Sequence, residues 1–96
     1  MIIKFSPQRR DDVLTVIKTG DMLNINGEDF DFSFITEGST LPAEAVGSEW
    51  VVGDVSRTNG QLTLTLLLPN SIDATDAAKF PVDLTDPVDG PLELPV

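Results

Sequence analysis

The sequence predicts an all-β fold: a small antiparallel sandwich or open barrel, built from hairpins of seven to eight short strands. Two Asn-Gly pairs, Asn26-Gly27 and Asn59-Gly60, mark tight turns, because both residues tolerate the positive φ that a type I′ turn requires. The residues flanking each pair alternate between apolar and polar, as in a half-buried sheet. The 96 residues allow a single β domain over 1–96, with at most one or two helical turns in loops.

The second Asn-Gly pair predicts how its two strands face each other. Thr58 faces Gln61 across the turn. Farther out, Val51 faces Leu68. This register gathers one apolar face, which consists of Val51, Val55, Leu62, Leu64, Leu66 and Leu68. Trp50, Val52 and Leu67 fall on the opposite face, so one end of the hairpin is apolar on both sides.

The first Asn-Gly pair predicts a second hairpin with its own apolar face. Leu23 faces Phe30 in this register. The face consists of Leu23, Ile25, Phe30, Phe32 and, beyond them, Phe34. A third turn at Thr19-Gly20 sets Lys18 opposite Asp21 and adds Leu14 and Val16 to the same face. Residues 13–34 are therefore expected to form a three-stranded meander.

The remaining segments are predicted to be short strands and two longer connections. Met1–Ser6 alternates like a strand, and we expect Pro7 to end it. Residues 36–48 and 69–80 are connections, with single helical turns at 42–45 and 75–79. The C-terminal residues around 82–84 and 92–94 flank a turn at 86–90. Prolines at 81, 91 and 95 cannot donate ladder hydrogen bonds, so these are short edge strands at best.

The composition excludes several classes of function. The chain has no Cys and no His, which removes disulfides, thiol and imidazole catalysis, and the commonest metal ligands. We therefore expect no enzyme, no cofactor and no metal. The longest uninterrupted apolar run, Leu66–Leu68, is far shorter than the ~20 residues that span a bilayer, so no membrane partner is expected.

The acidic residues do not match a calcium or an acid–base site. If Asn24 and Asn26 were ligands in an EF-hand loop, Met22 would take the first position and Ser33 the last, and neither can supply a carboxylate. Aspartates at 29 and 31 are predicted on the solvent face of a strand instead. Among sixteen acids, two carboxyls at the spacing of a glycosidase pair arise easily by chance.

The charge is unevenly distributed along the chain. The net charge is −10, yet residues 1–18 carry four basic residues against two acids, a net of +2, and residues 19–96 carry −12. An acidic surface repels the phosphate backbone, which excludes a conventional nucleic-acid reader. Arg9-Arg10-Asp11-Asp12 is either an exposed turn whose charges pair locally or, with Lys4, a small basic spot for an acidic partner.

Trp50 is the most informative single residue. Residues 36–46 or the C-terminal strands cover it, or it lies at a subunit interface, where a Trp among aliphatic residues is a typical anchor. The candidate interface residues are Trp50, Val52 and Leu67 together with Lys4, Arg9 and Arg10.

Several segments resemble small uncharacterised proteins that prophages and tailed phages encode among their structural genes, in the tail region. They include the opening ten residues, Gly20-Asp21, Ile25–Glu28 and Phe30–Phe32, and further along Leu41-Pro42, the Trp50 strand, Leu62–Pro69 and Asp89–Pro91. The likeness covers nearly the whole chain. It implies a phage context, and it supplies no reaction and no catalytic residues.

Two functions of different classes follow. The first is a phage-derived structural or assembly protein, associated with the tail, that contacts phage structural proteins or its own copies in the host bacterial cytoplasm or in the virion. The second is an acidic host-directed inhibitor that imitates DNA. The first is favoured, because a low count of basic residues, six, creates the net charge, whereas a phosphate mimic needs dense rows of acids.

Overall fold

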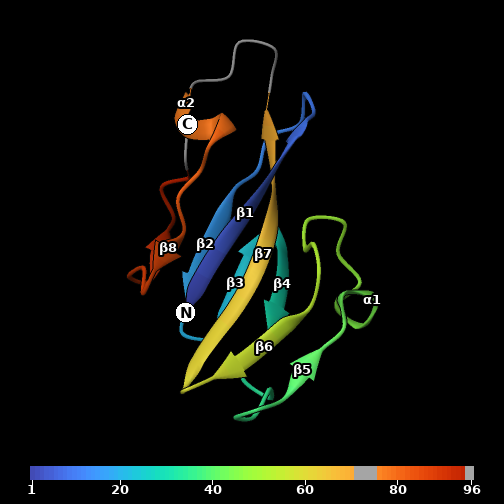
Figure 1. The fold of residues 1–96 in the computed structure, drawn as a ribbon, viewed down its shortest axis with the longest axis vertical. Coiled ribbons are helices and arrows are strands. Elements are labelled where there is room, and N and C mark those ends of the chain that lie inside the picture. Colours follow the sequence, from blue (N-terminus) through green and yellow to red (C-terminus); the bar gives the residue numbers. More distant parts are fainter. Residues whose placement is uncertain (71–75, 95–96) are drawn as a thin grey trace.

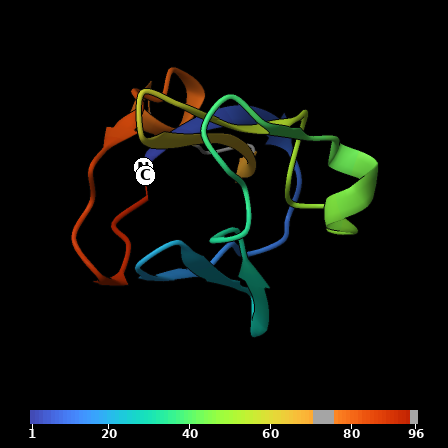
Figure 2. The ribbon, with the colours of Figure 1, turned by 90° about the horizontal axis from the view of Figure 1, so that it is seen from below.

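The computed structural model, which describes residues 1–70 and 76–94, contains two β-sheets packed face to face (Figures 1 and 2). The first sheet has the order β5 (Thr40–Leu41), β6 (Val55–Thr58), β7 (Gln61–Asn70), β1 (Ile2–Arg9) and β8 (Leu84–Thr85). The second has the order β4 (Glu28–Asp31), β3 (Met22–Ile25), β2 (Val16–Thr19) and β9 (Gly90–Pro91). Two four-residue helices, α1 (Ala43–Val46) and α2 (Asp76–Lys79), lie in the connections. The all-β class is confirmed, and the architecture is a sandwich.

Two details differ from the expected antiparallel set of seven to eight strands. The described residues form nine strands, because Thr40–Leu41 pairs with β6 inside a segment predicted to be a connection. The other difference is that β1 and β7 run parallel, with Ile3 beside Leu64 and Phe5 beside Leu66. No hairpin joins these two strands, since the chain passes through the second sheet between them, and their direction is therefore not fixed by a local turn.

Both Asn-Gly hairpins form as predicted. Thr58 pairs with Gln61 around the second turn, and Leu23 pairs with Phe30 around the first. The two turn residues have positive φ in each case, 51° and 89° at Asn26-Gly27 and 53° and 78° at Asn59-Gly60. These angles are those of the type I′ region, whose twist matches that of the flanking strands.

Two predicted registers are wrong by two residues. Gly20, with φ of 58°, takes the first central position of its turn, where a type II′ turn places glycine, so Thr19 rather than Lys18 closes the hairpin. In the other hairpin Val51 bridges Leu66 rather than Leu68, because an irregular stretch around Gly53, with φ of 79°, adds two residues to one strand. A shift of two keeps each side chain on its predicted face.

Strand β1 continues through Pro7, where the sequence predicted its end. The N–H of Arg10 donates to the Asn70 carbonyl, and the Met1 carbonyl accepts from Asp86 on the opposite edge. The N–H and C=O groups of successive residues in a strand point alternately to its two sides, so those of the odd-numbered residues of β1 point away from β7. The missing N–H of Pro7 therefore removes no bond to β7, as is typical of proline in a strand that is open on one side.

The core lies between the two sheets. Its buried residues come mainly from the predicted apolar faces and comprise Ile3, Leu14, Val16, Leu23, Ile25, Phe32, Ile35, Val51, Val55, Leu62, Leu64, Leu66 and Leu68. Phe34 was predicted on the same face but is 64% exposed. The chain turns after β4, where the N–H of Ile35 donates to the Phe32 carbonyl, and this turn carries Phe34 out of the core.

The C-terminal segment joins one side of the sandwich. β8 pairs with β1 at the edge of the first sheet, and β9 pairs with β2 at the edge of the second. Short edge strands were predicted around 82–84 and 92–94. The first forms at Leu84–Thr85, but the second forms at Gly90–Pro91, at the end of the predicted turn, and residues 92–94 lie outside it. The Asp89 carboxylate, in the turn between them, accepts hydrogen bonds from Lys18 Nζ at 2.8 Å and from the Gly20 N–H at 3.1 Å. This carboxylate ties the turn to the β2–β3 hairpin.

Acid is expected to loosen this turn. The hydrogen bond from the Lys18 ammonium, and then that from Gly20, hold the pKa of Asp89 below its ordinary value of 3.8. The native chain then binds fewer protons here than the unfolded chain, so the contribution is full above that value and is lost as the pH falls below it. Amide-exchange protection factors of residues 84–92, relative to those of β7, should therefore fall as the pH is lowered through about 4 and further below it. Asp89→Asn should show a smaller acid response, and an unchanged response would contradict this role.

Candidate functional site

The structure brings Arg10 and Trp50 together. The Arg10 guanidinium lies 4.7 Å from the centre of the Trp50 ring, within the range of a cation–π contact. The same guanidinium pairs with Asp12 at 2.6 Å and with Glu49 at 3.6 Å. The predicted local pairing of the arginine–aspartate turn is thus confirmed for Arg10. The half-buried indole also packs against the core. The side chain over its ring, Arg10, comes from the β1–β2 connection, whereas the predicted covers were residues 36–46 or the C-terminal strands.

Leu67 and Val52 lie beside Trp50, as the predicted face requires. The N–H of Leu67 donates to the Trp50 carbonyl at 2.8 Å, and the N–H of Val52 donates to the Thr65 carbonyl at 2.9 Å. Leu67 is buried, with 5% exposure, while Val52 is half-buried. These side chains present little free apolar surface to a partner.

Lys4 and Arg9 are exposed but do not form one patch with each other. They lie on opposite faces of β1, because an even and an odd position of a strand point in opposite directions. Five residues of extended strand also separate them by roughly 16 Å. The candidate interface residues thus divide into a covered group around Trp50, which includes Arg10, and two exposed cations, Lys4 and Arg9, that lie apart from each other.

Removal of the Arg10 side chain should expose the indole. The chain has one Trp, so its fluorescence reports this site alone. We expect Arg10→Ala to shift the emission to longer wavelength and to lower the free energy of unfolding by about 0.5–1 kcal/mol. Arg9→Ala is the matched control and should change neither quantity. Identical emission from the two variants would show that Arg10 does not cover the ring in solution.

Arg57 joins the two sheets at one end of the sandwich, a role that the sequence analysis missed. Its Nε donates to the Ile35 carbonyl, and a terminal guanidinium nitrogen donates to the Asp21 carboxylate at 2.9 Å. Asp21 lies in the β2–β3 turn of the second sheet, and Arg57 lies on β6 of the first. Arg57 lies opposite Leu62, as the Asn59-Gly60 turn predicts, and therefore on the inner face of its sheet. This inward position of a charged residue was the one signal for its role in the predicted register.

Glu37 fixes the connection between the sheets to the turn of the β6–β7 hairpin. Its carboxylate accepts the N–H groups of Asn59 and Gly60, at 2.8 and 2.5 Å. The N–H of Gly38 donates to the Arg57 carbonyl at 2.8 Å. These bonds join residues about twenty positions apart, and no sequence spacing indicates them.

An apolar hollow lies beside β4, the edge strand of the second sheet. Its volume is about 190 Å³. It is lined by Phe30, Phe32 and Phe34, by Leu41 of β5, by Ala45 and Val46 of α1, and by Asp29 and Asp31 of β4. The exposed ring of Phe34 borders it. Figure 2 shows α1 and β4 toward the same side of the sandwich. Within the described part of the chain, this surface combines an unpaired strand edge, exposed apolar area and negative charge.

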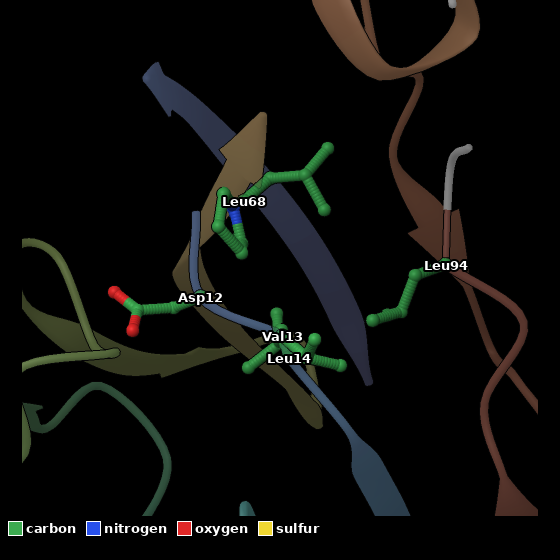
Figure 3. Close-up of a pocket in the computed structure, with 6 residues that line it drawn as sticks. Asp12, Val13, Leu14, Leu68 and Leu94 are labelled. Atoms are coloured by element: carbon green, nitrogen blue, oxygen red, sulfur yellow. The ribbon is translucent and has the colours of Figure 1, made fainter. Parts of the chain in front are cut away.

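A second hollow of about 200 Å³ lies at the other end of the core. Leu14, Leu68 and Leu94 approach it from the β1–β2 connection, β7 and the C-terminal segment (Figure 3). The Asp12 carboxylate at its border pairs with Arg10. Among the described residues that line this hollow, the one charged side chain, Asp12, is thus already paired.

No three carboxylates of the described residues converge to hold a metal ion. The two helices in the same ranges are a single turn each, and none in this part of the chain could cross a bilayer. Comparisons of the chain with protein-family models, with curated proteins and with solved structures find no match.

Proposed function

We propose that this domain is a phage-derived structural or assembly protein, associated with the tail, that acts by protein–protein contact. The phage context depends on the resemblance of the segments named above. One observation carries the mode of action: a hollow lined mainly by apolar side chains, with a strongly exposed phenylalanine, lies beside a strand edge that is unpaired within the described residues. Exposed apolar area at a sheet edge is typical of surfaces that bind another protein chain.

The placement of the acids gives less support to a DNA mimic. Several carboxylates are occupied by groups of their own chain, as Glu37, Asp21 and Asp89 illustrate. A phosphate mimic requires rows of free carboxylates that face solvent.

Affinity purification from cells that carry the parent phage tests the proposal. A tagged copy of the chain is expected to retain an identified tail protein of that phage, or to associate with untagged copies of itself. DNA competition provides the contrast: the purified chain should fail to displace DNA from a basic host enzyme at low salt. Displacement of DNA, together with retention of no tail protein and no second copy, would favour the inhibitor instead.

A further inference from the structure

The open edge of β4 has main-chain groups placed for one more strand. Within the described residues β4 pairs only with β3. The Phe32 N–H donates to the Asp21 carbonyl at 3.0 Å, so even-numbered residues direct their main chain toward β3. Because these groups alternate along a strand, the N–H and C=O groups of Asp29 and Asp31 point outward. The edge therefore offers two donors and two acceptors to an added chain.

The hollow beside this edge has the size of a side-chain site. Its volume of about 190 Å³ lies below the roughly 300–1,000 Å³ of small-molecule pockets. Phe30 lines it from β4, and Leu41 and Val46 line it from β5 and α1. One apolar side chain from an added strand, placed opposite Phe30, would face this hollow.

The charge of the edge selects the partner. Glu28, Asp29 and Asp31 are all exposed, and none of them takes part in an ion pair within the described part of the chain. The Asp29 carboxylate accepts only the neutral amide of Asn24, and that of Asp31 accepts the N–H of Ser33. The Ser33 hydrogen bonds hold the pKa of Asp31 below its ordinary value, so it is ionised at neutral pH.

These charges disfavour a second copy of β4 and favour a cation. Like charges placed opposite each other on neighbouring strands are destabilising, so two copies of this acidic edge repel. Lys or Arg in an added strand would instead meet uncompensated carboxylates.

We propose that the β4 edge binds an extended segment of a partner protein in which basic residues alternate with an apolar one. The segment adds as the next strand of the second sheet and bonds to the main chain of Asp29 and Asp31. Since residues directly opposite share a face, its Lys or Arg side chains lie beside the two aspartates and its apolar side chain enters the hollow. This inference rests on the proposed function, because it names the partner chemistry of that contact surface.

A peptide titration tests the inference. The probe is acetyl-Thr-Arg-Leu-Arg-Thr-amide, added to the full ¹⁵N-labelled chain and followed by amide chemical shifts. Saturable shifts confined to residues 28–34 and 41–46 are expected. Two matched peptides serve as controls. One has Glu in place of both Arg residues, and the other has backbone N-methylated arginines, which keep the charge but cannot donate main-chain hydrogen bonds to the edge. Both should bind at least about fivefold more weakly.

Two substitutions at one position separate charge from strand addition. Asp29→Ala removes one carboxylate and should weaken binding of the arginine peptide about two- to fivefold. Asp29→Pro also removes the outward N–H, which costs no bond to β3, and should weaken binding by a further two- to tenfold, on the order of one hydrogen bond. Asp54→Ala, at an exposed acid away from this edge, should leave binding unchanged. Unaltered amide shifts of residues 22–25 show that the hairpin is intact, and if Asp29→Pro disrupts it, the N-methylated peptide makes the same test.

Three results would overturn the inference: equal binding of the arginine and glutamate peptides, equal binding by the alanine and proline variants in an intact hairpin, or no saturable shift up to several millimolar peptide. Concentration-dependent shifts of residues 28–34 without peptide would assign the edge to a second copy and overturn the inference as well.

The proposed function can fail independently of the edge inference. If the wild type and Asp29→Pro retain the same tail protein equally, only the edge inference fails. If neither retains one while the peptide binds, only the proposed function fails.

Discussion

Leu66→Ala is expected to lower the free energy of unfolding by about 2–5 kcal/mol, which is the range for removing a fully buried leucine side chain. Leu66 has 0% exposure and lies in the middle of the first sheet, beside Phe5 of β1 and opposite Val51. The cavity would therefore open where the parallel and the antiparallel pairings meet. A domain of this length has a total stability of about 5–14 kcal/mol, so the loss is a large fraction of it.

Thermal and urea unfolding measure this effect. The midpoint temperature should fall by about 10 °C or more, since 1 kcal/mol corresponds to roughly 4–8 °C at this size. Thr65→Ala, at the neighbouring half-buried position on the outer face, is the matched control and should lose less than about 1 kcal/mol. Loss of any cooperative transition in Leu66→Ala agrees with the structure. Equal stability of the two variants would contradict the placement of Leu66 between the sheets.

Arg57→Ala is expected to lower the free energy of unfolding by about 1–3 kcal/mol, because it removes the groups that donate hydrogen bonds to the Ile35 carbonyl and to the Asp21 carboxylate. The Arg57 side chain is 17% exposed, and that of Asp21 is 39% exposed. Water can replace the lost donor at Asp21 more easily than at the Ile35 carbonyl, which lies in a buried residue. Most of the loss should therefore come from Ile35.

Two further variants isolate the guanidinium. Arg57→Met keeps most of the aliphatic stem and should lose nearly as much stability as Arg57→Ala, whereas Arg57→Lys keeps the charge without the planar fork and should fall between wild type and alanine. The denaturant midpoint at constant slope gives the comparison. Arg9→Ala removes an exposed arginine of the same sheet and should stay within about 0.5 kcal/mol of wild type. If Arg57→Ala matches Arg9→Ala, Arg57 does not join the sheets.

The local part of this fold was predictable from the sequence, because hairpin turns and alternating side chains are encoded by neighbouring residues. The two Asn-Gly turns fixed their strand registers correctly near the turn. The predicted registers failed near two glycines. At Gly20 the turn lies one position later than predicted, and around Gly53 one strand contains two additional residues. Both the predicted and the observed registers fit the same alternation of apolar and polar residues. The faces were still correct, as a shift of two preserves them.

The long-range part was not predictable. The parallel pairing of β1 with β7 joins residues about sixty positions apart, and no turn sets its direction. The contacts of Arg57 with Ile35 and of Glu37 with Asn59 depend on that arrangement, so no local signal could show them. For the candidate site, the sequence placed Asp29 and Asp31 correctly on a solvent face, yet it missed the hollow because it assigned Phe34 to the core.

The central proposal is that this domain is a tail-associated component that acts by protein–protein contact. Quantitative mass spectrometry of purified particles and tail intermediates of the parent phage tests it most directly. The chain is expected in a constant molar ratio to one tail protein across independent preparations. Its absence from both particles and tail intermediates, in cells that express it, would contradict the claim.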